Sequence, residues 1–245
     1  MNRSKIRTTS ASLHILAMAL MLCDHLWATV VPGNDWLTCL GRLAYPIFAF
    51  LLVEGYFHTH DLKKYALRLL IFALISEIPF NLMYSSSPFF PFHQNVIWTL
   101  LIGLGMIHLN ERAKAASIPR RVLRAASSLI LGSLLGLLSF SDYNAAGVLT
   151  VLVFYFFRGN AWWCCAGQLA GLYYINFELL KGLSYEVSLL GRNIFLPQQG
   201  FALLALIPLW LYRGEKGRVL PGFRQFCYWF YPAHMLLLYL IRLLT

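Results

Sequence analysis

Charged residues are scarce in this chain. Only 12% of its 245 residues are charged, whereas ordinary soluble domains contain about 25%, and 59% of the residues are hydrophobic. The mean hydropathy is +0.62. A chain with so few polar groups cannot cover a water-exposed surface with them, so the composition excludes a soluble enzyme.

Familiar catalytic and metal-binding signatures are also missing. The five cysteines form no CxxC pair and lie within apolar runs, which argues against a disulfide framework or a zinc site. The patterns GxSxG, Walker and HExxH do not occur, so acyl chemistry by a soluble-type triad has no support. His58, His60 and Asp61 form an HxHD stretch, but such a stretch at a membrane edge is more often a solvated turn. We therefore predict no metal site.

Long apolar runs are what the chain has in abundance. About 20 apolar residues cross a hydrocarbon core of roughly 30 Å, and short turns rich in Gly, Pro, Ser, Asn and Asp separate the runs. We predict an all-α polytopic membrane protein with one domain, residues 1–245, built as a single bundle of about nine transmembrane helices. The predicted spans are 12–31, 37–57, 64–84, 94–110, 122–140, 143–157, 160–179, 194–212 and 226–244.

The net charge of +10 reports on topology before it reports on partners, and it does not indicate nucleic-acid binding. Most Lys and Arg residues lie in the N-terminal segment and in the loops after the second, fourth, sixth and eighth predicted spans. Cytoplasmic loops carry an excess of basic residues, so this bias predicts a cytoplasmic N-terminus and a C-terminus on the opposite side.

Polar residues within the predicted spans converge on one depth. A charge in hydrocarbon costs several kcal/mol, at least about 2.5, so each such group needs a partner or a wet cavity. The helix rise of about 1.5 Å per residue places a group of polar residues near the outer side, and others below it. The outer group is Asp24, His25, Arg42, Glu77, Asn81, His93, Gln94, Asn95 and Asp142; His14, Glu54, Arg68 and His108 lie below. This distribution predicts a polar cavity open toward both faces.

Structural roles compete with functional ones at most of these positions. Glu54 with Arg68, and Asp24 with Arg42, are most simply ion pairs that tie neighbouring helices. Adjacent residues on a helix point about 100° apart, so Asp24 cannot easily orient the His25 ring, and Glu77 or Asp142 are the candidates for that task. His93 is equally well explained as an interfacial side chain, and His234 as a packing residue or a lining of the cavity.

Six segments resemble the TraX family, in the same order and over nearly the whole chain. They are MLCDH at 21–25, GRLAYPIFAF at 41–50, EGYF at 54–57, RLLIFALISEIPFN at 68–81, HQNV at 93–96 and YPAH at 231–234. The resemblance implies a bacterial cytoplasmic-membrane acetyltransferase that uses acetyl-CoA and modifies the N-terminus of pilin. TraX proteins are in turn similar to a wider superfamily of transmembrane acyltransferases, whose first helix carries a basic or polar residue, ten others and a catalytic His. Here the matching pair is His14 and His25.

The resemblance and the depth argument together give each residue an expected role. His25 is expected to act as general base or to carry the acetyl group, oriented by Glu77 or Asp142, with Arg42, Asn81 or Asn95 stabilising the oxyanion. Asp24 and His93 complete the expected catalytic set. Donor binding is expected at His14, Arg68, Arg112, Lys114, Arg120, Arg121 and His234.

Other functions are kept beside the acetyltransferase. Intramembrane His and carboxylates also form proton relays, so a small-solute or proton-coupled transporter is the first alternative. A non-catalytic membrane assembly protein is the second. The expected partners are an acceptor peptide or glycan and membrane lipids, with homo-oligomerisation left open.

Overall fold

Helices make up most of the chain in the computed structural model, which describes residues 7–114, 116–189 and 192–244. The helices are α1 (Ser10–Thr29), α2 (Asp35–Gly41), α3 (Ala44–His58), α4 (Leu62–Ser85), α5 (Val96–Glu111), α6 (Ile118–Leu138), α7 (Asn144–Phe156), α8 (Trp162–Tyr173), α9 (Leu206–Trp210) and α10 (Phe223–Leu244). A π-helix, η1 (Tyr174–Leu180), continues α8, and a 3₁₀ helix, η2 (Gln198–Ala205), precedes α9.

Five helical segments among the described residues are long and apolar enough to cross a membrane. They are Ser10–Thr29, Asp35–His58, Leu62–Ser85, Ile118–Leu138 and Phe223–Leu244. Shorter apolar helices cover Val96–Glu111, Asn144–Phe156 and Gln198–Trp210. The protein is therefore a mainly helical membrane protein, as predicted, while nine crossings stay a prediction.

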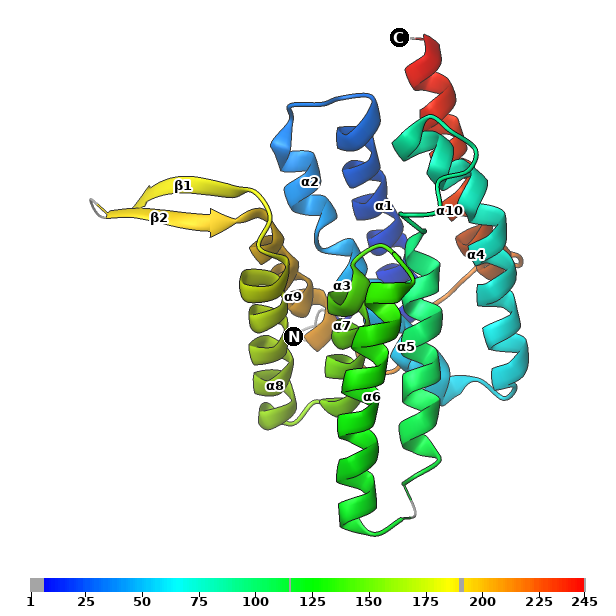
Figure 1. Cartoon of the computed structure of the whole chain (residues 1–245), viewed down its shortest axis with the longest axis vertical. Helices are drawn as coiled ribbons and strands as arrows, with labels where there is room; N and C mark the ends of the chain where they lie inside the picture. The colour runs from blue at the N-terminus through cyan, green and yellow to red at the C-terminus, as the bar shows by residue number, and fades with distance from the viewer. Residues whose placement is uncertain (1–6, 115, 190–191, 245) are drawn as a thin grey trace, which may run out of the picture.

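The prediction of an all-α fold is wrong in one region. Strands β1 (Ser184–Leu189) and β2 (Arg192–Pro197) form an antiparallel hairpin that pairs Ser184 with Pro197, and it projects sideways from the bundle (Figure 1). The eighth predicted span, 194–212, accordingly begins in a strand and becomes helical only at Gln198. A short apolar run does not distinguish strand from helix by its pattern, which explains the error.

The second predicted span is divided into α2 and α3 by a break at Arg42 and Leu43. Pro46 lies in the first turn of α3, where its missing N–H leaves no helical hydrogen bond unmade. The chain can therefore restart a helix just before this proline.

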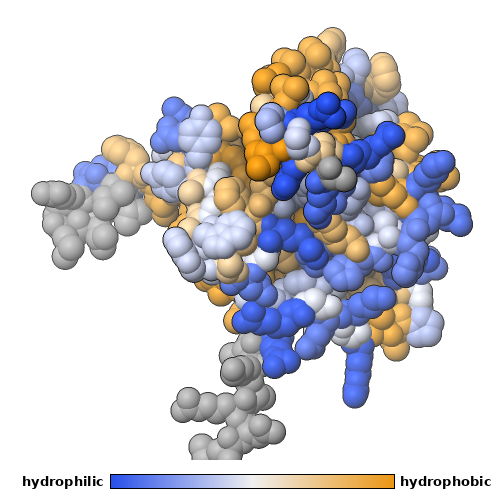
Figure 2. Space-filling view, turned by 90° about the horizontal axis from the view of Figure 1, so that it is seen from below, coloured by the Kyte–Doolittle hydropathy of each residue, from blue (hydrophilic) through white to orange (hydrophobic). Residues whose placement is uncertain are grey.

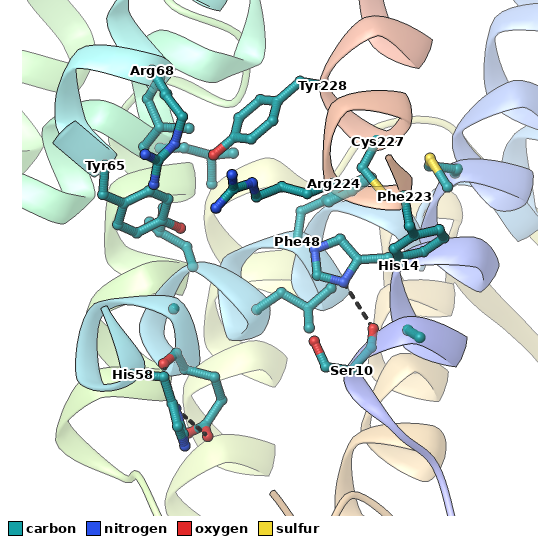
Figure 3. Close-up of a pocket in the computed structure, with 18 of the residues that line it drawn as sticks. Ser10, His14, Phe48, His58, Tyr65, Arg68, Phe223, Arg224, Cys227 and Tyr228 are labelled. Atoms are coloured by element: carbon teal, nitrogen blue, oxygen red, sulfur yellow. Dashed lines mark hydrogen bonds and ion pairs between the residues drawn. The ribbon is translucent and has the colours of Figure 1, made fainter. Parts of the chain in front are cut away.

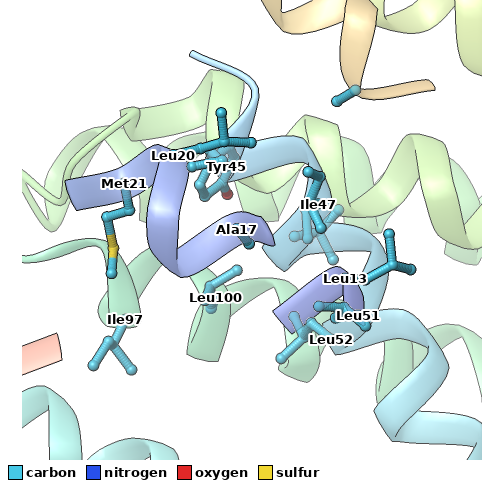
Figure 4. Close-up of a cluster of buried hydrophobic side chains, with 14 of the residues drawn as sticks. Leu13, Ala17, Leu20, Met21, Tyr45, Ile47, Leu51, Leu52, Ile97 and Leu100 are labelled. Carbon is cyan, nitrogen blue, oxygen red and sulfur yellow. The ribbon is translucent and has the colours of Figure 1, made fainter. Parts of the chain in front are cut away.

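The core lies where α1 packs against α3 and α5. Leu13, Ala17 and Leu20 repeat at helical spacing on one face of α1 and are all buried. Figure 4 shows them near Ile47, Leu51 and Leu52 of α3, with Leu100 of α5 below Ala17 in the view. Because α1 also contacts α2 and α10, it is held from several directions.

The lower end of the bundle in Figure 1 is hydrophilic. Figure 2 looks onto this end and shows hydrophilic residues gathered over it, with hydrophobic residues around the rim. Arg112, Arg120 and Arg121, near the turn between α5 and α6, are exposed there. This is the end that the positive-inside rule predicts to be cytoplasmic.

Candidate functional site

Two buried histidines from opposite ends of the sequence form a hydrogen-bonded pair. His25 of α1 and His234 of α10 are 7% and 6% exposed, and Nδ1 of His25 lies 2.6 Å from Nε2 of His234. The rings are parallel within 4°, with centroids 4.9 Å apart. The nitrogens are much closer than the centroids, so the two imidazoles meet edge to edge.

A backbone carbonyl determines which nitrogens carry protons when the pair is neutral. Nδ1 of His234 donates to the Phe230 carbonyl oxygen at 2.7 Å, so Nε2 of His234 is an acceptor. Nδ1 of His25 must then be the donor of the shared hydrogen bond. The Nε2 atom of His25, which has no hydrogen-bond partner in the described part of the chain, keeps its lone pair.

A cavity of about 470 Å³ approaches this pair from the lower end of the bundle. Its lining begins at Ser10 and Glu54 and reaches Met21 of α1 and Tyr231 of α10. Met21 lies about one helical turn before His25, and Tyr231 about one turn before His234. The cavity therefore ends about one turn from the histidine pair, and an outer mouth stays a prediction.

Cationic side chains line part of the cavity. Figure 3 shows Arg68 and Tyr65 of α4 facing Arg224 and Tyr228 of α10, with His14 of α1 beside them. The buried Nε of Arg68 has no hydrogen-bond partner among the described residues. Such an arrangement favours an anionic ligand.

The loop before α10 adds Lys216 to the lining because it caps α1. The backbone N–H groups of Ser10 and Ala11, free at the helix start, donate to the carbonyls of Glu215 and Lys216 at 2.8 and 3.0 Å. Gly217 has φ of +80°, and a Cβ there would lie 2.5 Å from the hydroxyl oxygen of Thr9. This turn therefore requires glycine to bring Lys216 to the cavity.

The predicted ion pair between Glu54 and Arg68 is wrong. Arg158 donates hydrogen bonds to both carboxylate oxygens of Glu54, to Oε1 at 2.7 Å and to Oε2 at 3.3 Å, and Nδ1 of His58 lies 3.8 Å from Oε2. The loop after α7 brings Arg158 to the lower end of α3, a position that helix depth alone did not reveal. Arg68 is therefore not paired with Glu54, and its side chain lines the cavity.

The four basic residues expected to attract the donor near α5 and α6 lie outside the cavity lining. Arg112, Lys114, Arg120 and Arg121 are exposed, and Lys114 pairs with Glu111 at 3.4 Å. The structure places Arg224 and Lys216 in the lining instead.

The predicted pair of Asp24 and Arg42 is confirmed. Nη2 of Arg42 donates to Oδ1 of Asp24, which also accepts a hydrogen bond from the Thr38 hydroxyl at 2.7 Å. A Cβ on Gly41 would collide with the Asp24 side chain, so glycine lets α2 approach α1 this closely. The pair holds α1 and the broken second span together beside the histidine pair.

Glu77 does not orient His25, which corrects the first of the two expected partners. Its Oε1 accepts hydrogen bonds from the backbone and side-chain amides of Asn95, and from Trp98 Nε1 at 2.7 Å. Asn95 also caps α5, accepting from the Ile97 N–H at 3.0 Å. Glu77 and Asn95 therefore anchor the start of α5, where a negative charge is favoured by the helix dipole.

Asp142, the second expected partner, makes no hydrogen bond with His25 either. Its Oδ1 lies 3.7 Å from His93 Nε2, and both side chains are more than one third exposed. Tyr84 connects this region with the histidine pair, since its ring lies 5.6 Å from His93 and 6.1 Å from His25. Asn81 is buried, with no partner for its Oδ1 among the described residues.

The TraX protein family model matches residues 9–242, nearly the whole chain. The chain belongs to the TraX family. It is also 27% identical over 252 residues to a probable fimbrial assembly protein FimC, serogroup H1, of Dichelobacter nodosus, and the match covers 92% of each chain. No solved structure matches the chain.

The structure adds residues that the sequence argument did not select. Tyr231 lies between the cavity and the histidines, with its ring 6.4 Å from His25 and 5.9 Å from His234. Arg224 was counted only as a topology signal. Two features of the sequence could have pointed to Tyr231 and to the pairing of His234 with His25. They are the YPAH segment at 231–234 and the depth at which it lies in α10.

Proposed function

We propose that this protein is an integral membrane acetyltransferase that moves an acetyl group from cytosolic acetyl-CoA to an amine or hydroxyl acceptor. The observation that carries the proposal is the cavity, which leads from cationic side chains at the predicted cytoplasmic end to within about one helical turn of a histidine pair with one free imidazole nitrogen. A transporter has no comparable support, because an inverted repeat of the kind that builds many transporters is not recognisable in the sequence.

The cavity suits a long donor with an anionic end and an apolar arm. Arg68, Arg224 and Lys216 would hold phosphate groups, and Phe48, Leu51 and Leu52 offer an apolar wall. His14 and His25 are eleven residues apart on α1, which corresponds to about 16 Å of helix rise. When bound, acetyl-CoA supplies an acetyl thioester, and its reacting end would lie toward Tyr231.

His25 would act as the general base. Its Nε2 lone pair would remove a proton from the acceptor amine or hydroxyl, a task that typically contributes about 10²- to 10⁴-fold to the rate. The Asp24–Arg42 pair would hold α1 in place next to His25. Burial of both imidazoles would exclude bulk water from the thioester.

The acceptor that we propose is the N-terminal amine of a pilus or fimbrial subunit, in the bacterial cytoplasmic membrane. The supports are the family membership and the description of the Dichelobacter relative as a fimbrial assembly protein. That description also favours an assembly role without catalysis as the second candidate.

Release of CoA by the detergent-purified protein tests the proposal. The assay combines acetyl-CoA with a short peptide that has a free N-terminal amine, and the matching N-formyl peptide serves as the control. We expect acetyl transfer to the free amine by the wild-type protein and none by a folded His25→Ala variant that still binds CoA. Absence of CoA binding by the wild type would reject the proposal, and equal transfer by both proteins would remove His25 from it.

A further inference from the structure

We infer that His234 is a positioning residue that fixes the tautomer of His25 and takes up its Nδ1 proton during the reaction. The inference rests on the proposed acetyl transfer and deepens it. The sequence argument gave His234 to donor binding, but the structure places it against His25 and outside the cavity lining.

The Phe230 carbonyl oxygen determines where the protons lie on the two imidazole rings. It can only accept, so it holds a proton on Nδ1 of His234. The remaining nitrogen of His234 can then only accept while the ring is neutral, and it holds a proton on Nδ1 of His25. Two successive hydrogen bonds thus leave the lone pair of His25 on Nε2, the nitrogen that the proposed chemistry requires.

No carboxylate among the described residues hydrogen-bonds to either ring. Asp24 is bound to Arg42 and Thr38, and Glu77 is bound to Asn95 and Trp98. The usual orienting partner of a catalytic histidine is a carboxylate or a backbone carbonyl. Here a second imidazole stands between the carbonyl and the base.

The proton balance follows from these tautomers. As the acceptor nitrogen bonds to the acetyl carbon, His25 Nε2 takes the amine proton, and the Nδ1 proton of His25 moves to Nε2 of His234. His234 then carries the positive charge, with its Nδ1–H still directed at the Phe230 carbonyl. As the carbon–sulfur bond breaks, the proton on Nε2 of His234 returns to Nδ1 of His25, and the proton on Nε2 of His25 passes to the leaving thiolate, so both imidazoles regain their starting neutral tautomers.

Paired substitutions distinguish this role from a structural one. Leu has no hydrogen-bond acceptor, whereas the side-chain oxygen of Gln can accept from Nδ1–H of His25. With the peptide assay described above, we expect His234→Leu to lower kcat by about 100-fold or more while the KM for acetyl-CoA changes little. His234→Gln restores orientation but not proton uptake, so its kcat should lie between those of His234→Leu and the wild type.

Equal kcat values for wild type and a folded His234→Leu variant, together with an inactive His25→Ala variant, would overturn the inference and leave the proposed function standing. Inactivity of the wild type would instead count against the proposed function.

Nitrogen-15 NMR of histidine-labelled wild-type protein decides the tautomers without any activity measurement. We expect a protonated Nδ1 and an unprotonated Nε2 on both His25 and His234, assigned with the His25→Ala and His234→Leu variants. A protonated Nε2 on His25 at neutral pH would overturn the inference, whatever the kinetics.

Discussion

Removing one cavity arginine tests where the donor phosphates bind. Arg68→Gln deletes a guanidinium whose buried Nε has no partner among the described residues, and Arg224→Gln deletes the one that faces it. A hydrogen bond to a charged group contributes about 1.5–3 kcal/mol, and about 1.4 kcal/mol corresponds to tenfold in Kd. Each substitution should therefore weaken CoA binding by about 10- to 100-fold.

Isothermal titration with CoA at about 0.1 M salt measures this effect. The matched controls are Arg120→Gln and Arg121→Gln, which remove exposed arginines outside the cavity lining. We expect these controls to bind CoA within about twofold of the wild type, because exposed charges are screened over roughly 10 Å at 0.1 M salt. Weaker binding by the controls, with unchanged binding by both cavity variants, would refute the reasoning.

Three further changes have defined outcomes. Tyr231→Phe removes a hydroxyl from a residue that lines the cavity; if this hydroxyl stabilises the oxyanion, kcat falls about 10- to 100-fold with little change in KM, and an unchanged kcat would exclude that role. Gly41→Ala forces a methyl group into the Asp24 side chain, which should cost about 1–3 kcal/mol and appear as a lower Tm. Hydrogen bonding to the Lys64 backbone N–H lowers the pKa of Asp61, so its stabilising effect is complete at neutral pH and is lost on acidification. The difference in Tm between wild type and Asp61→Asn should accordingly shrink as the pH falls toward 3, and a constant difference would contradict this.

Helix positions were predictable because apolar runs and turn residues determine them directly. The run at 12–31 became Ser10–Thr29, and the run at 226–244 became Phe223–Leu244. The break before Ala44 was hidden, because apolar residues continue on both sides of it. The break between α2 and α3 becomes visible only in the folded structure, where Arg42 lies beside Asp24.

Depth along the bundle selected both histidines of the buried pair as candidates but could not assign their partners. His25 and His234 were both selected, yet carboxylates were expected to orient His25 because they are the commonest partners of histidine. Glu54 was placed beside Arg68 by depth, whereas rotation about the helix axes brings it to Arg158. Rotation depends on packing between helices, which a single sequence does not specify.

The shortness of α7 is tolerated because this helix lies inside the protein. Its thirteen residues rise about 20 Å, which is roughly 10 Å less than a typical hydrocarbon core. Among them only Asn144, at the start of the helix, is exposed, and α3, α5, α6 and α8 pack around α7. Non-helical backbone can lie at membrane depth where protein encloses it, so the turns at the two ends of α7 can lie below the membrane surface, beside two of the helices that form the cavity wall.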